Sequence, residues 1–219
     1  MLWDYLENTL QLSLTIIMLP VSLYQYISTR KRGWSYLLVF FLGTLVSTYH
    51  WTAYLLIMGD SPNSSDAMIY IGWNVAFAIL LLLIWHMKPR EERRYFHPLM
   101  LLPIPLNIYQ LTLYIPYGAV NSTYQVTVLT AAACLAIQSL LWHRKQKREG
   151  KEPPEEARKT LLPAAILVLV GCEFGMWTST CMDEPISNLY YPFSILASLD
   201  YLLIGRAAAR AFGTGMKKA

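Results

Sequence analysis

Charged residues are scarce in this 219-residue chain, because Asp, Glu, Lys and Arg together make up only 15% of it. An average soluble domain has roughly 25%. The charges also fall in clumps, separated by stretches of about 20 residues that have almost none. A soluble enzyme, a nucleic-acid-binding protein or a disordered chain would scatter charge along its whole length. The scarcity and its pattern exclude those three classes and predict an integral membrane protein.

Cysteine is scarce as well. Three Cys residues are too few for a disulfide framework, and none of them belongs to a Cys-x-x-Cys pair. Redox and haem chemistry therefore have no support, and we expect no cofactor.

Long apolar runs are what the chain has in abundance, since 55% of its residues are hydrophobic. A transmembrane helix needs about 20 mostly apolar residues. A membrane-spanning strand would instead alternate apolar and polar residues, which the apolar run 78–84 does not do. The sequence predicts an all-α membrane protein whose seven transmembrane helices form a single domain over residues 1–219. The predicted helices cover approximately residues 9–27, 34–58, 68–87, 98–117, 123–142, 161–181 and 189–207.

The positions of the charges predict how these helices are oriented. With the N-terminus outside, all 18 Lys and Arg residues are cytoplasmic and lie in 30–32, 88–94, 144–159 and 206–218. Positive charge concentrates on the cytoplasmic side of membrane proteins, so we expect the N-terminus outside, the C-terminus inside, and location in the plasma membrane. The basic loops would attract anionic lipid headgroups, and no nucleic-acid partner is expected. The outer segments carry only acids: Asp4, Glu7, Asp60, Asp66, Asp183 and Glu184.

Helices one to three and five to seven can be aligned as an internal repeat. Trp51-Thr52 matches Trp177-Thr178 near the outer ends, and the run 82–84 matches 202–204. This pattern favours a parallel 3+1+3 duplication, in which the proline-broken fourth helix joins the two halves. The alternative is coincidence, because membrane helices are built from few residue types.

In helix number, orientation and repeat, the whole chain resembles the superfamily of seven-helix PQ-loop-type sugar transporters and opsins. This resemblance implies a cavity between the two halves. The motifs depart from the family: Pro20 has no counterpart at 131–134, where PQ-loop proteins place prolines in both halves. A retinal pigment needs a lysine in its last helix, and no predicted helix contains one. The segment 47–50, Ser-Thr-Tyr-His, is similar to the Ser-x-x-His of ceramidase-type zinc hydrolases, but the paired C-terminal histidines of that family are missing. We therefore expect neither a metal site nor enzymatic activity.

Three ionisable residues within the predicted helices are candidates for function, because such residues are costly inside a membrane. We expect Glu173 to couple protons or to recognise a cationic or hydroxylated solute. Asp200 would act as a relay on the cytoplasmic side, and His50 as a proton acceptor near Glu173. Each has a structural alternative: Glu173 as a neutral carboxyl bonded to a neighbouring helix, Asp200 reaching towards Arg206, and His50 bonded to the backbone or to Tyr49.

Polar and aromatic residues at central or outer depth form a candidate lining. Asn74, Gln125, Trp51 and Trp177 would contribute to a cavity that is open to the outside and binds a small organic or cationic ligand by stacking or cation–π contact. Further aromatic residues are available for its wall, unless they simply form the interfacial belt: Tyr49, Tyr70, Trp73 and Tyr190.

Two functional hypotheses follow. The first is a small-solute transporter with a cavity between the two three-helix halves, and the second is a seven-helix sensor or accessory subunit that signals through a separate partner. The sequence favours transport, and it leaves the identity of the solute and the oligomeric state open.

Overall fold

The structure is a computed structural model that describes residues 2–59, 62, 67–117, 119–151 and 159–215. This described part is helical and contains no strand. Three short 3-10 helices, η1 (Pro98–Leu101), η2 (Ile115–Tyr117) and η3 (Ile186–Leu189), flank two of the α-helices. The α-helices are α1 (Leu2–Thr29), α2 (Arg32–Met58), α3 (Ala67–Met87), α4 (Arg90–Arg94), α5 (Pro103–Tyr114), α6 (Val120–Arg148), α8 (Leu161–Ser179) and α9 (Tyr190–Phe212).

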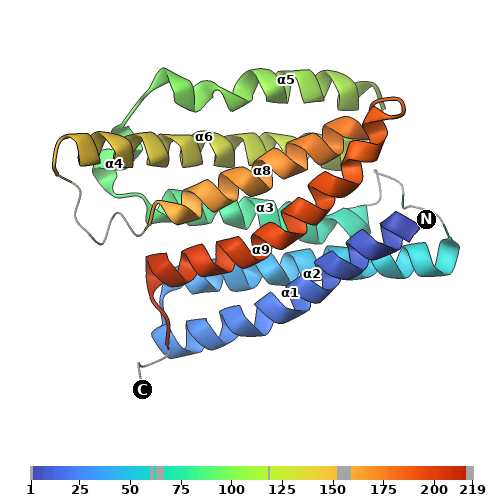
Figure 1. Cartoon of the computed structure of the whole chain (residues 1–219), viewed down its shortest axis with the longest axis horizontal. Coiled ribbons are helices and arrows are strands. Elements are labelled where there is room, and N and C mark those ends of the chain that lie inside the picture. Colours follow the sequence, from blue (N-terminus) through green and yellow to red (C-terminus); the bar gives the residue numbers. More distant parts are fainter. Residues whose placement is uncertain (1, 60–61, 63–66, 118, 152–158, 216–219) are drawn as a thin grey trace.

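The long helices run roughly along one axis (Figure 1), and the contacts between them close into a ring. Contacts follow the order α1, α2, α3, α6, α8, α9 and back to α1, while α5 packs on the outside of α6. The helix α3 thus meets α6 just as α9 meets α1, which is the arrangement that a parallel 3+1+3 repeat would produce. The repeat itself stays a prediction.

Four helices in the described part are long and apolar enough to cross a membrane, covering Trp3–Thr29, Met68–Met87, Val120–Arg148 and Leu161–Ser179. These match four of the seven predicted helices. The helices α2 and α9 have 27 and 23 residues, which is sufficient length, but they are not among the helices that are apolar enough. Crossing of the membrane by α2, α9 and the fourth predicted segment stays a prediction.

The fourth predicted helix, 98–117, is three consecutive pieces: η1, α5 and η2. Proline explains the breaks, because a proline at the first turn of a helix starts it and one further along ends it. Pro103 lies at the start of α5, and Pro116 lies in η2, just beyond its end. The helix α5 has 12 residues, or about 18 Å, against the ~30 Å of a hydrocarbon core.

The helices α2 and α3 approach closely at two glycines. A Cβ atom built on Gly43 would lie 2.5 Å from the carbonyl oxygen of Gly72. One turn further along, the Ser47 hydroxyl donates to the Ile69 carbonyl at 2.5 Å and accepts the backbone N–H of Trp73 at 3.0 Å. Small residues let the helix backbones approach, and the hydroxyl then links them.

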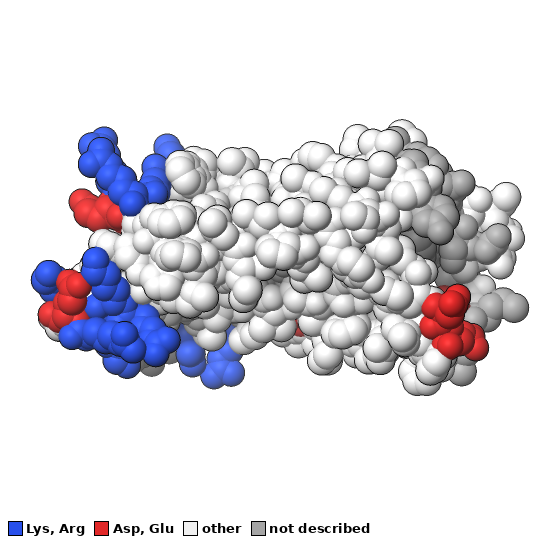
Figure 2. Space-filling model, turned by 90° about the horizontal axis from the view of Figure 1, so that it is seen from above, with Lys and Arg blue, Asp and Glu red and all other residues white. Residues whose placement is uncertain are grey.

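Most of the charges seen in Figure 2 lie at the two ends of the bundle. Lys and Arg gather at one end, the basic end, together with a few acids, while the far end shows Asp and Glu only. The helix α1 starts at the acidic end and α9 finishes at the basic end (Figure 1). This separation is the one that the sequence predicts. Asp60 and Asp66, both predicted to be outer acids, lie outside the described residues.

Candidate functional site

A small polar cavity lies between the two groups of three helices, α1–α3 and α6–α9. Its volume is about 20 Å³, which is room for about one water molecule. Four predicted site residues line it: Glu173, Trp177, Trp51 and Gln125. The other lining residues are Asn8, Gln11, Trp73, Phe77, Met176, Tyr190, Ser194 and Ala197.

Glu173 is the most deeply placed acid of this cavity, with 4% of its surface exposed. Its Oε2 atom accepts a hydrogen bond from the indole Nε1 of Trp177 at 3.0 Å. The two residues are four apart, so they lie on the same face of α8. The donor that holds Glu173 therefore comes from its own helix, and not from a neighbouring helix as the structural alternative supposed.

The cavity adjoins a larger space at the acidic end, which we call the vestibule. Its volume is about 430 Å³. Trp51, Trp177 and Tyr190 line both spaces and thus form the boundary between them. The remaining residues of the vestibule wall are Asp4, Glu7, Thr180, Glu184, Ser187, Asn188 and Tyr191.

Glu7 belongs to this site, although the sequence interpretation assigned it to an outer segment. The helix α1 begins at Leu2 instead of near residue 9, so Glu7 is inside a helix and only 4% exposed. Its carboxyl oxygens accept hydrogen bonds from Asn8 Nδ2 at 3.1 Å and from the Ser194 hydroxyl. The spacing of Glu7, Gln11 and Thr15 was the signal that could have revealed this polar helix face.

Asn74 serves as a link between helices and does not line the cavity. It donates to Asn121 Oδ1 at 3.1 Å and accepts from Gln125 Nε2 at 2.9 Å. The resulting chain of amides ties α3 to α6 and holds Gln125 at the cavity wall.

The structure does not bring His50 to the site. Its side chain is exposed, its Nδ1 lies 2.8 Å from the Val46 carbonyl oxygen, and its ring packs against Tyr49 at 5.6 Å. It lines neither the cavity nor the vestibule. This geometry matches the structural alternative for His50.

Asp200 is also absent from the cavity wall. It is 4% exposed, and neither of its carboxyl oxygens has a hydrogen-bond partner in the part of the chain that the structure describes. The structural alternative, an approach to Arg206, is not formed, since Arg206 is exposed and no ion pair joins the two described residues.

Aromatic residues close the cavity on the side of the basic end. Gln11, a cavity residue, donates to the hydroxyl of Tyr201 at 3.0 Å. Below this bond, the Tyr201 ring meets Phe40 and Phe41 edge to face, with centroids 5.7 and 5.8 Å apart. Because Phe40 and Phe41 are fully buried, these three rings form a packed floor.

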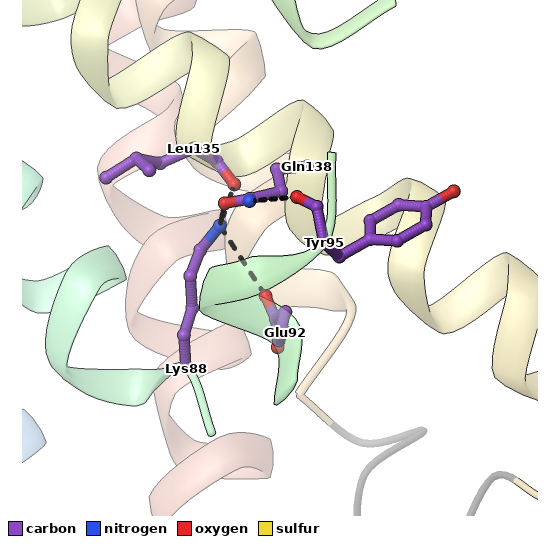
Figure 3. Close-up of polar contacts among 5 residues, drawn as sticks. All are labelled: Lys88, Glu92, Tyr95, Leu135 and Gln138. Atoms are coloured by element: carbon purple, nitrogen blue, oxygen red, sulfur yellow. Dashed lines mark hydrogen bonds and ion pairs between the residues drawn. The ribbon is translucent and has the colours of Figure 1, made fainter. Parts of the chain in front are cut away.

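A second polar cluster lies at the basic end (Figure 3). The Lys88 side chain, 1% exposed, points towards α6 and donates to the Leu135 carbonyl and to Gln138 Oε1, both at 2.6 Å. Glu92 Oε1 lies 3.6 Å from the same ammonium. Gln138 in turn donates to the Tyr95 carbonyl at 2.5 Å. The cluster ties the end of α3 and the segment with α4 to the middle of α6.

Burial lowers the pKa of Lys88 from 10.5 to about 8, and the Glu92 carboxylate only partly opposes this change. The sequence interpretation treated Lys88 as one of the 18 cytoplasmic Lys and Arg residues. Its four-residue spacing from Glu92 was the only local signal of a pair.

Compared with known proteins, the chain matches no family model, no curated protein and no solved structure. The resemblance to PQ-loop-type carriers and opsins therefore stays a prediction.

Proposed function

We propose that this chain is a multi-pass membrane carrier of a small solute. The solute enters the vestibule at the acidic end and passes between α1–α3 and α6–α9. In this proposal seven helical segments cross the plasma membrane, with the N-terminus outside and the basic end in the cytoplasm. Four sufficiently apolar helices and the separation of charge between the two ends support this orientation (Figure 2).

The observation that carries the proposal is the polar cavity at the level of Glu173. It lies between the two three-helix groups, where a carrier with parallel halves would bind its solute. The adjoining vestibule of about 430 Å³ has the size of sites for small organic molecules, which run from about 300 to 1,000 Å³. The aromatic boundary of Trp51, Trp177 and Tyr190 separates the two spaces.

The cavity is closed on the side of the basic end, as a carrier is in one state of its transport cycle. The floor of Phe40, Phe41 and Tyr201 and the Lys88–Gln138 contact join the two halves towards the basic end. In a carrier, rocking of one half against the other would break such contacts and open the cavity to the cytoplasm. The arrangement corresponds to an outward-open, inward-closed state.

A sensor is the second candidate, and the packed floor is the observation that favours it. A receptor needs no passage below its ligand. Binding in the vestibule would shift helices that end in the basic loops, and a separate partner would respond to that shift.

Uptake into proteoliposomes tests the proposal. Flux of a transported solute is expected to depend on pH, and Glu173→Gln should abolish that dependence. Asp200→Asn tests the predicted cytoplasmic relay, and His50→Gln is the control because His50 lies outside the cavity. Absence of flux for every solute, together with ligand-induced thermal stabilisation, would overturn the carrier and support the receptor.

A further inference from the structure

The vestibule has an unusual combination of charge and aromatic surface. Apart from tyrosines, its ionisable wall residues are all acids: Asp4, Glu7 and Glu184. Among the residues that the structure describes, no Lys, Arg or His lines it, and Figure 2 shows the Lys and Arg side chains at the opposite end. The side chains of the described lining therefore contribute acids and no basic group.

Neutral donors hold two of these acids in place. The Tyr191 hydroxyl donates to Asp4 Oδ1 at 3.0 Å, while Asn8 and Ser194 donate to Glu7. The donors to Glu7 are neutral, so they orient its carboxyl group without adding a positive charge beside it. A cationic group entering the vestibule would gain that electrostatic attraction, whereas an anion would be repelled.

The walls that face these acids are aromatic. Trp51 and Trp177 are the two indoles at the boundary, and Trp51 packs on Tyr70 and Trp73 at centroid distances of 6.0 and 5.7 Å. Trp177 is fixed by its bond to Glu173. Ring faces attract ammonium groups, and tryptophan does so most strongly.

We propose that the vestibule binds an organic ammonium cation, with Glu7 as its counter-charge and Trp51, Trp177 and Tyr190 as its aromatic wall. This inference rests on the proposed function, because it identifies the class of solute that the carrier takes. The cation stays in the vestibule in the state described, since the inner cavity of about 20 Å³ admits only a water-sized group. A neutral polyol would leave Glu7 without a counter-ion and is disfavoured.

Choline is a suitable probe, because 3,3-dimethyl-1-butanol has nearly the same shape without the charge. Binding is measured on the purified full-length chain in lipid nanodiscs by calorimetry and by thermal shift. Choline is expected to bind at least tenfold more tightly than the neutral alcohol. Trp177→Leu and Glu7→Gln should each weaken choline binding about tenfold, which corresponds to ~1.4 kcal/mol.

Matched variants separate a binding effect from a folding effect. Trp177→Phe retains an aromatic face and should preserve most of the affinity that Trp177→Leu loses. Tyr49→Leu removes another aromatic residue of α2 that is 58% exposed and outside the vestibule wall, so it should leave binding unchanged. Equal binding of choline and its neutral analogue, or equal loss in Trp177→Leu and Tyr49→Leu, would overturn the inference.

The outcomes for the cation and for the carrier are distinguishable. Uptake of a neutral or anionic solute through Glu173-dependent flux, with no choline binding at millimolar concentration, would overturn the cation assignment alone. Choline binding without uptake of choline or any other solute would support the cation assignment and overturn the carrier.

Discussion

The Nζ atom of Lys88 lies 2.6 Å from the Oε1 atom of Gln138 and fastens the end of α3 to the middle of α6. The same ammonium donates to the Leu135 carbonyl at 2.6 Å and forms an ion pair with Glu92, whose Oε1 atom lies 3.6 Å away. Because α3 and α6 belong to different three-helix groups, this contact joins the two halves at the basic end.

Replacing Lys88 with a side chain of similar length and no charge tests the importance of this contact. Lys88→Met leaves Glu92 buried without its cation, so we expect a loss of about 3–5 kcal/mol in unfolding free energy. The double variant with Glu92→Gln should recover part of that loss. Chemical denaturation in detergent measures the unfolding free energy. The control is Glu149→Gln, which removes an exposed ion pair with Lys151 and should cause no measurable change in that free energy. Equal stability of Lys88→Met and the wild type would contradict the prediction.

The lowered pKa of Lys88 predicts that the free energy of unfolding depends on pH. Its pKa is about 8 in the folded chain and 10.5 in its ordinary state. Between these values the unfolded chain binds the proton that the folded chain has released, so raising the pH favours folding. We expect the stability of the wild type, relative to Lys88→Met, to rise from about pH 8 towards pH 10.5 and to be constant below that window. Denaturation of both proteins at several pH values measures the difference between their unfolding free energies. A difference that does not change with pH would contradict the prediction.

Asp200 is predicted to lower stability. A buried carboxyl without a hydrogen-bond partner costs about 1–3 kcal/mol, and neither oxygen of Asp200 has one among the described residues. Asp200→Ala should therefore raise the unfolding temperature. Tyr201→Phe, which removes the bond from Gln11, is the contrasting variant and should lower it. A drop for Asp200→Ala would show that Asp200 has a stabilising partner; a rise accompanied by loss of flux would mark it as a functional residue.

Two helix glycines, Gly72 and Gly171, allow a prediction in which the second serves as the control for the first. A Cβ at Gly72 would collide with the Gly43 carbonyl oxygen, whereas a Cβ at Gly171 would meet nothing within 4 Å. Gly72→Ala should destabilise the chain by about 1–3 kcal/mol, because the backbones of α2 and α3 must separate. Gly171→Ala should be neutral or stabilising by up to about 1 kcal/mol, because alanine favours the helix. Thermal unfolding of both variants measures the contrast, and equal effects would contradict it.

Much of the fold could be predicted from the local sequence. The predicted segments 34–58 and 68–87 agree closely with α2 and α3, because length and apolar composition are properties of a segment itself. The start of α1 was predicted too late, since Glu7 was assigned to an outer segment although α1 begins at Leu2. The segment 98–117 was correctly seen as proline-broken, but prolines interrupt it enough that no single helix forms.

The candidate site was only partly predictable. Glu173, Trp51, Trp177 and Gln125 were selected for their residue type and depth, and all four line the cavity. His50 met the same criteria and is exposed, because residue type does not determine towards which neighbour a helix face turns.

The sequence by itself determined the positions of the helical segments and the separation of basic from acidic ends, since both follow from residues that are close in the chain. Only the tertiary structure decided that Glu7 meets Ser194 and that Lys88 meets Gln138, pairs separated by 187 and 50 residues. The rotation of each helix about its axis depends on how all the faces pack together, and that rotation determined which polar groups are enclosed.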